Sequence, residues 1–114
     1  MHGSWDEMID AVALRSGRYT GRAKYSFVRC YVQGFGDGRG DDVLADFHEW
    51  LLQQPLHRGS NYVWWALLLR EVFIDLRGTD LGYPREDDLV YPDEDAVAIK
   101  HLFKRLREFL SSNA

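Results

Sequence analysis

The chain has 114 residues and a mass of 13.3 kDa, the usual size of one domain with a single hydrophobic core. Its net charge of −4 at pH 7 argues against a dedicated nucleic-acid binder, because such proteins neutralise phosphates with an excess of Lys and Arg. The longest apolar stretch, Tyr62 to Leu69, is too short for a membrane span, and the acidic N-terminus does not resemble a signal peptide. Because the one cysteine, Cys30, cannot form an internal disulfide, we expect a soluble protein of the reducing cytoplasm.

A first helix is predicted over residues 4–15. Ser4 and Glu7 have the spacing of a capping box, in which each side chain accepts a hydrogen bond from the other residue's amide. Ser16 and Gly17 are expected to end the helix, since glycine readily adopts the left-handed conformation that closes many helices. Apolar residues follow the capping box at helical spacing: Trp5, Met8, Ile9 and Val12.

Residues 24–35 are ambiguous, because their aromatic and β-branched side chains also suit a strand. The pattern favours a helix, since strict alternation would bring Arg29 and Gln33 to the buried side. The apolar face of that helix would contain Phe27, Val28, Tyr31, Val32 and Phe35. Glycines then occupy every second position from Gly34 to Gly40, which predicts a flexible turn.

Two further helices are predicted in the middle of the chain. Asp41 or Asp42 caps the third, which ends before Pro55, and its apolar positions share one face. Ser60 and Asn61 precede the fourth. That helix is apolar nearly all round from Tyr62 to Phe73, which is typical of a helix surrounded by others. We therefore expect the fourth helix to be the central element.

A long loop, residues 77–91, precedes a fifth helix that begins at Pro92. Its inward positions are predicted to be Ala96, Ile99, Leu102, Phe103, Leu106, Phe109 and Leu110. Five helices with short connections and no internal repeat predict an all-α fold. We expect one small helical bundle, a single domain over residues 1–114.

The connection between the first two helices is rich in cations and glycine. Such a loop before a helix can bind an anion, because free amides and the helix dipole point at the ligand. However, Gly17 and Gly21 do not have the spacing of a P-loop, and a helix, not a strand, precedes them. We favour a structural bend, and the alternative is an anion or nucleotide site built by Arg15, Arg18, Tyr19, Arg22 and Lys24.

No motif for metal binding or nucleophilic catalysis stands out. His48, His57 and His101 lack a second His or Cys at the spacing that places two ligands on one helix face. Cys30 is adjacent to the apolar face of its helix, where a free cysteine usually behaves as a small hydrophobic residue. We therefore expect no cofactor and no metal, and binding more than catalysis.

Charge is distributed unevenly along the chain. Residues 15–40 carry six Lys or Arg against one Asp, and residues 41–95 carry thirteen acids against four bases. The densest acidic group surrounds the start of the fifth helix: Glu86, Asp87, Asp88, Asp93, Glu94 and Asp95. In one interpretation these acids stabilise the positive end of the helix and solvate the loop. In the other they form a surface that binds a basic protein.

Three stretches of the sequence are similar to segments of other proteins: "IDAVALRSGRYTG", "FHEWL" and the closing "LFKRLREFL". Together they resemble a group of small bacterial proteins of uncharacterised function, in which an early helix runs into a segment of the type R-P-x-M-Y-[IL]-G. Small proteins of this kind without catalytic residues are often accessory binders, including immunity proteins that neutralise a toxin.

These observations predict a non-enzymatic protein that binds another protein, as an immunity protein acting through its acidic surface. The rival hypothesis is a small anion binder or enzyme centred on Arg15 to Lys24. Homo-oligomerisation through an apolar face of the third or fifth helix is a further possibility.

Overall fold

The structure, a computed structural model, describes residues 3–16 and 24–112. Within these ranges it consists of helices and connecting segments, without strands: α1 (Gly3–Ser16), α2 (Tyr25–Arg39), α3 (Val43–Leu52), α4 (Trp64–Arg77) and α5 (Pro92–Ser112), with short 3-10 turns η1 (Pro55–His57) and η2 (Glu86–Asp88). The predicted all-α bundle of five helices is confirmed. None of the described helices is both long and apolar enough to cross a membrane.

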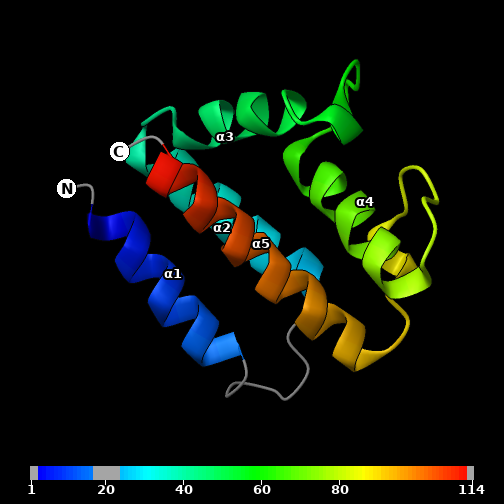
Figure 1. Ribbon diagram of the computed structural model, residues 1–114. Helices are drawn as coiled ribbons and strands as arrows, with labels where there is room; N and C mark the ends of the chain where they lie inside the picture. The colour runs from blue at the N-terminus through cyan, green and yellow to red at the C-terminus, as the bar shows by residue number, and fades with distance from the viewer. Residues whose placement is uncertain (1–2, 17–23, 113–114) are drawn as a thin grey trace.

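The helix that joins the bundle together is α5. It packs against each of the other four helices, and Figure 1 shows it running diagonally across the molecule with α2 behind it and α1 and α4 on either side. The prediction that the fourth helix is central therefore needs correction. Although α4 is apolar nearly all round, it packs mainly on α5 and α3. The 21-residue α5 is long enough to reach all its neighbours.

One hydrophobic core lies between the helices. Its largest side chains without appreciable exposure come from α1, α2, α3, α4 and α5: Ile9, Tyr25, Phe47, Phe73, Leu51, Leu67, Leu68, Leu69, Leu102 and Leu106. The apolar spacing of α1, α3 and α5 predicts most of this core. On α5, however, Ala98 is buried and Ala96 is exposed.

The structure corrects two predictions for α2. Its glycine-rich end is helical as far as Arg39, and the chain turns only at Gly40, which is left-handed with φ 67°. The packing around Gly36 accounts for a glycine inside this helix. A Cβ there would lie 2.7 Å from Leu44 Cδ1, so a larger residue would require the Leu44 side chain of α3 to shift.

The buried face of α2 is also rotated from the predicted one. Its buried residues are Tyr25, Val28, Val32 and Gly36, whereas Phe27 and Tyr31 are 72% and 54% exposed. The sequence pattern treated Gly36 as a turn residue, although it is the point of closest packing.

Tyr25 connects three helices, α2, α4 and α5, through hydrogen bonds. Its backbone N–H, at the first position of α2, donates to Asp95 Oδ1 on α5 at 2.7 Å, and its hydroxyl donates to the Trp65 carbonyl oxygen on α4 at 2.8 Å. The side chain is completely buried, and burial raises the pKa of Tyr25 well above its ordinary value of 10.0, with a further contribution from Glu86. Asp95 thus satisfies an amide at the positive end of α2, which has no acid in its own first turn.

We predict that Asp95→Ala lowers the free energy of unfolding by about 1–3 kcal/mol, because it leaves the Tyr25 amide buried without an acceptor. Urea unfolding followed by circular dichroism measures this loss. The matched control is Asp93→Ala, which removes an exposed acid from the same turn of α5 and should cost less than about 1 kcal/mol. Equal losses in the two variants would contradict this role for Asp95.

Candidate protein-binding surface

The loop between α4 and α5 is held against the bundle by arginines. Arg70 on α4 pairs with Asp80 through two hydrogen bonds of 2.6 and 3.0 Å, and these hold the pKa of Asp80 at about 2. The same guanidinium donates to the Tyr83 hydroxyl at 3.2 Å. Tyr83 in turn stacks on Tyr62, with ring centroids 3.8 Å apart. The first half of the loop is therefore fixed by ion pairing and aromatic stacking.

Two more arginines hold the second half of the loop. Arg29 on α2 pairs with Glu86 at 2.8 Å, and its guanidinium lies 4.3 Å from the centre of the Trp65 ring. Arg77, at the end of α4, forms a two-pronged ion pair with Glu94 in the first turn of α5. These contacts give the loop a defined outer surface.

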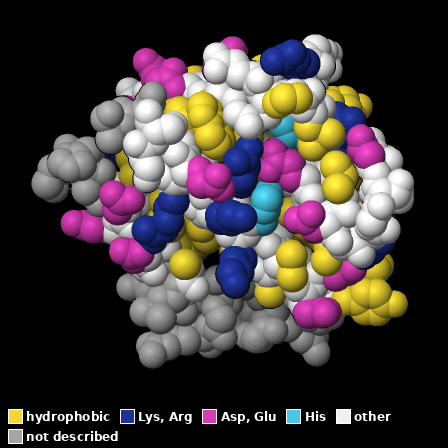
Figure 2. All heavy atoms as spheres, in the orientation of Figure 1, with side chains coloured by type: hydrophobic (Ala, Val, Ile, Leu, Met, Phe, Trp, Pro, Cys, Tyr) yellow, Lys and Arg dark blue, Asp and Glu magenta, His cyan; other side chains and the backbone are white. Residues whose placement is uncertain are grey.

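That outer surface, called here the loop surface, combines exposed apolar side chains with free carboxylates. Its members are Leu81, Val90 and Tyr91, which are 53%, 67% and 63% exposed, and the exposed acids Asp87, Asp88 and Asp93. Near the start of α5, at the lower right, Figure 2 shows acidic side chains beside exposed hydrophobic ones. Large apolar side chains surrounded by charge are typical of protein-binding sites.

A groove of about 610 Å³ lies in the loop surface. Leu81, Val90 and the buried Phe73 ring form its apolar lining, and its charged lining consists of Asp87 and Asp88 together with Arg77 and Arg85. The groove can accept an apolar side chain. Arg77 in its lining is paired with Glu94, and neither Asp87 nor Asp88 has an ion-pair partner among the described residues.

The six acids singled out in the sequence divide into two groups. Glu86 and Glu94 form ion pairs with arginines, and Asp95 caps α2. Asp88 accepts a hydrogen bond of 2.8 Å from the Arg85 amide, so its charge is not neutralised by an ion pair. Among the described residues, Asp87 and Asp93 have no ion-pair partner either. The other half of the predicted cluster, Asp87, Asp88 and Asp93, is exposed and has no ion-pair partner among the described residues; these three are called here the uncompensated acids.

The alternative anion site lies mostly outside the described residues. Arg18, Tyr19 and Arg22 are not described, and neither is the side chain of Arg15; Lys24 is exposed. The structure does show that the first amide of α2, which an anion would need, already donates to a carboxylate of α5. An incoming anion would therefore face the negative charge of Asp95.

A second polar cluster, which the sequence analysis missed, surrounds Glu71 on α4. His57 Nε2 donates to Glu71 Oε2 at 2.7 Å, and His101 Nε2 donates to Glu71 Oε1 at 2.7 Å. Arg105 Nε lies 3.0 Å from the same Oε1. Arg105 also lies over the Trp50 ring, 4.8 Å from its centre. The cluster joins η1, α4 and α5. His57 lies 14 residues before Glu71 and His101 lies 30 residues after it, so no local spacing reveals that these side chains meet at Glu71.

The contacts of the Glu71 cluster hold η1, α4 and α5 together. Burial alone would raise the pKa of Glu71, but hydrogen bonds from His101 and His57 and the charge of Arg105 lower it to about 2. A carboxylate with that pKa is a weak general base at neutral pH. His57 is completely buried, and within the described part of the chain neither His57 nor His101 is hydrogen-bonded to a hydroxyl or a thiol.

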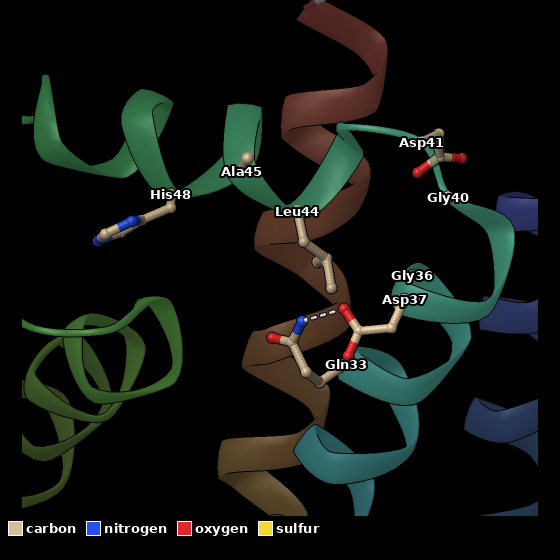
Figure 3. A pocket seen from close by; sticks show the side chains of 8 residues that line it. All are labelled: Gln33, Gly36, Asp37, Gly40, Asp41, Leu44, Ala45 and His48. Atoms are coloured by element: carbon tan, nitrogen blue, oxygen red, sulfur yellow. Dashed lines mark hydrogen bonds between the residues drawn. The ribbon is translucent and has the colours of Figure 1, made fainter.

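A second groove, of about 420 Å³, lies where α2 meets α3. Figure 3 shows Gln33 and Asp37 of α2 pointing toward each other, Leu44 of α3 pointing toward them, and His48 directed away. The polar groups of this groove already have internal partners. Gln33 accepts from Trp64 Nε1 at 2.9 Å, and His48 Nε2 donates to the Tyr62 carbonyl at 2.8 Å. We interpret this groove as a helix contact.

Over residues 3–16 and 24–112, no group of three or more His, Cys, Asp or Glu side chains is placed to hold a metal ion. Cys30 is a free, exposed thiol on α2.

Comparisons with protein families, curated proteins and solved structures find no match to this chain. The resemblance to a group of small bacterial proteins therefore stays a prediction.

We predict that Glu71→Gln lowers the free energy of unfolding at pH 7 by about 3 kcal/mol, because the variant removes the charged acceptor shared by Arg105, His57 and His101. Folding lowers the pKa of Glu71 from 4.5 to about 2, so the carboxylate stabilises the fold fully above pH 4.5. That contribution is lost as the pH falls toward 2. Urea unfolding at several pH values should therefore show the difference between wild type and Glu71→Gln shrinking below pH 4.5.

Asp75→Asn provides the control, since Asp75 is an exposed acid on the same helix. Its effect on stability should stay within about 0.5 kcal/mol. A Glu71→Gln deficit that does not change between pH 5 and pH 2 would contradict the proposed linkage.

Proposed function

We propose that this chain is a non-enzymatic protein-binding domain, and that it binds a basic protein through the loop surface. The observation that carries the proposal is the groove in which Leu81 and Val90 lie beside Asp87 and Asp88. An apolar side chain of the partner would enter the groove, with Lys or Arg residues of the partner next to the carboxylates. Tyr91, 63% exposed, would serve as an aromatic anchor at the edge.

Rigidity of the loop supports this assignment. Arg29, Arg70 and Arg77 fix the loop from α2 and α4, so the partner meets a surface that is ordered before binding. A preformed surface avoids part of the entropy cost of association. The three uncompensated acids add electrostatic attraction, which raises the association rate with a positively charged partner.

The partner class that we propose is a toxin, with this chain acting as its immunity protein in the cytoplasm. Toxins that cleave nucleic acids need a basic surface to bind phosphates, and an acidic inhibitor with apolar anchors can cover that surface. The uncompensated carboxylates beside exposed apolar side chains provide this combination. Co-purification with the product of the adjacent gene tests the toxin assignment, since an immunity protein is normally encoded beside its toxin.

We predict that the double substitution Asp87→Lys with Asp88→Lys slows association with the basic partner at least about 10-fold at low salt, because the steering charge is reversed. Tyr91→Ala should raise the dissociation constant about 30-fold, mainly through faster dissociation. Surface plasmon resonance at two salt concentrations separates these two effects.

Asp46→Lys with Glu49→Lys is the matched control, because it reverses two exposed acids on α3 without touching the loop surface. Its association rate should stay within about 3-fold of wild type. The proposal fails if the two double variants bind alike, or if all variants bind as the wild type does. If the adjacent gene product forms no complex with the wild type, the toxin assignment fails.

A further inference from the structure

The outward face of α2 carries exposed aromatic side chains that pack on no other helix among the described residues. Phe27 and Tyr31 lie one helical turn apart on this face, and they are 72% and 54% exposed. Gly34 and Gly38 continue the same face toward the C-terminal end of the helix. In Figure 1, α2 lies behind α5, so its buried side faces the bundle. The face formed by Phe27, Tyr31, Gly34 and Gly38 is called here the outer α2 face.

Contacts within the described chain do not account for the two glycines. A Cβ added to Gly34 or Gly38 would meet no heavy atom within 4 Å, and neither residue has the positive φ that favours glycine. A glycine inside a helix costs about 1 kcal/mol relative to alanine. By contrast, Gly36 is accounted for by its contact with Leu44.

We propose that the outer α2 face pairs with the same face of a second copy of this chain, in an antiparallel arrangement. With the two-fold axis between residues 32 and 33, Phe27 lies opposite Gly38 of the other copy, and Tyr31 lies opposite Gly34. Each aromatic ring then fills the space that a glycine leaves, and the two-fold axis repeats both contacts, which gives four in all. The glycines let the two helices approach closely enough to bury the rings.

Charge complementarity supports the antiparallel direction. The N-terminal end of α2 has the exposed Lys24 and no acid in its first turn. At the C-terminal end Arg39 is paired with Asp41 at 2.7 Å, and the exposed acids Asp37 and Asp42 leave this end negative. Antiparallel pairing sets the positive end of each helix against the acidic end of the other, and it opposes the two helix dipoles. A parallel pair would bring like ends together and set aromatic residues against aromatic residues.

The test is sedimentation velocity of the full chain from about 5 to 500 µM, with circular dichroism to verify folding. The wild type is expected to form a concentration-dependent dimer. Gly34→Leu is expected to stay folded, because the site is open, and to raise the dimer dissociation constant at least about 30-fold. Phe27→Ser should act in the same direction. Val97→Ser is the control, since Val97 is an exposed apolar residue, 43% exposed, that belongs to α5 and not to the outer α2 face.

Cys30 gives an independent readout, because it is the one cysteine of the chain and lies beside the outer α2 face. A short bis-maleimide should link two wild-type copies through Cys30, and Gly34→Leu should abolish this product. The proposal is overturned if the wild type is monomeric throughout the concentration range. A dimer that survives Gly34→Leu and Phe27→Ser, or that is lost in Val97→Ser instead, also overturns it.

Discussion

The arrangement of the bundle depends on one buried hydrogen bond, from the Tyr25 amide to the Asp95 carboxylate. It places an acid of α5 at the positive end of α2, and the Tyr25 hydroxyl ties the same point to α4 through the Trp65 carbonyl. Because Glu94 next to it pairs with Arg77, both ends of the long loop are fixed at the first turn of α5. The loop surface has its shape because this turn is anchored on two sides.

Hydrophobic spacing was sufficient to predict the fold class and the approximate limits of most helices. It failed on α2, where Gly36 is buried because Leu44 approaches it, and where Phe27 and Tyr31 remain exposed. A pattern based on side-chain hydrophobicity does not identify a buried glycine that permits close packing of two helices. It also assumes that every aromatic residue on a helix faces the core of its own chain.

The acidic cluster shows a different limit of sequence reasoning. Charge along the chain drew attention to the start of α5, but the pairing partners of these acids come from α2 and α4, far away in sequence. Glu71 illustrates the same point, since His57 and His101 reach it from η1 and α5. Which acids stay free, and which apolar residues flank them, depends on tertiary contacts. For that reason Leu81, Val90 and Tyr91 entered the candidate site only with the structure.

The anchoring of α2 by α5 is tested most directly by the hydrogen-exchange rate of the Tyr25 backbone amide, measured by NMR in the native protein. The first amide of a helix has no partner within the helix and normally exchanges fast. Our account predicts that the Tyr25 amide is protected as strongly as that of Val32 in the buried middle of α2. Exchange as fast as that of an exposed, unbonded amide would show that Asp95 does not hold α2, and would contradict the account.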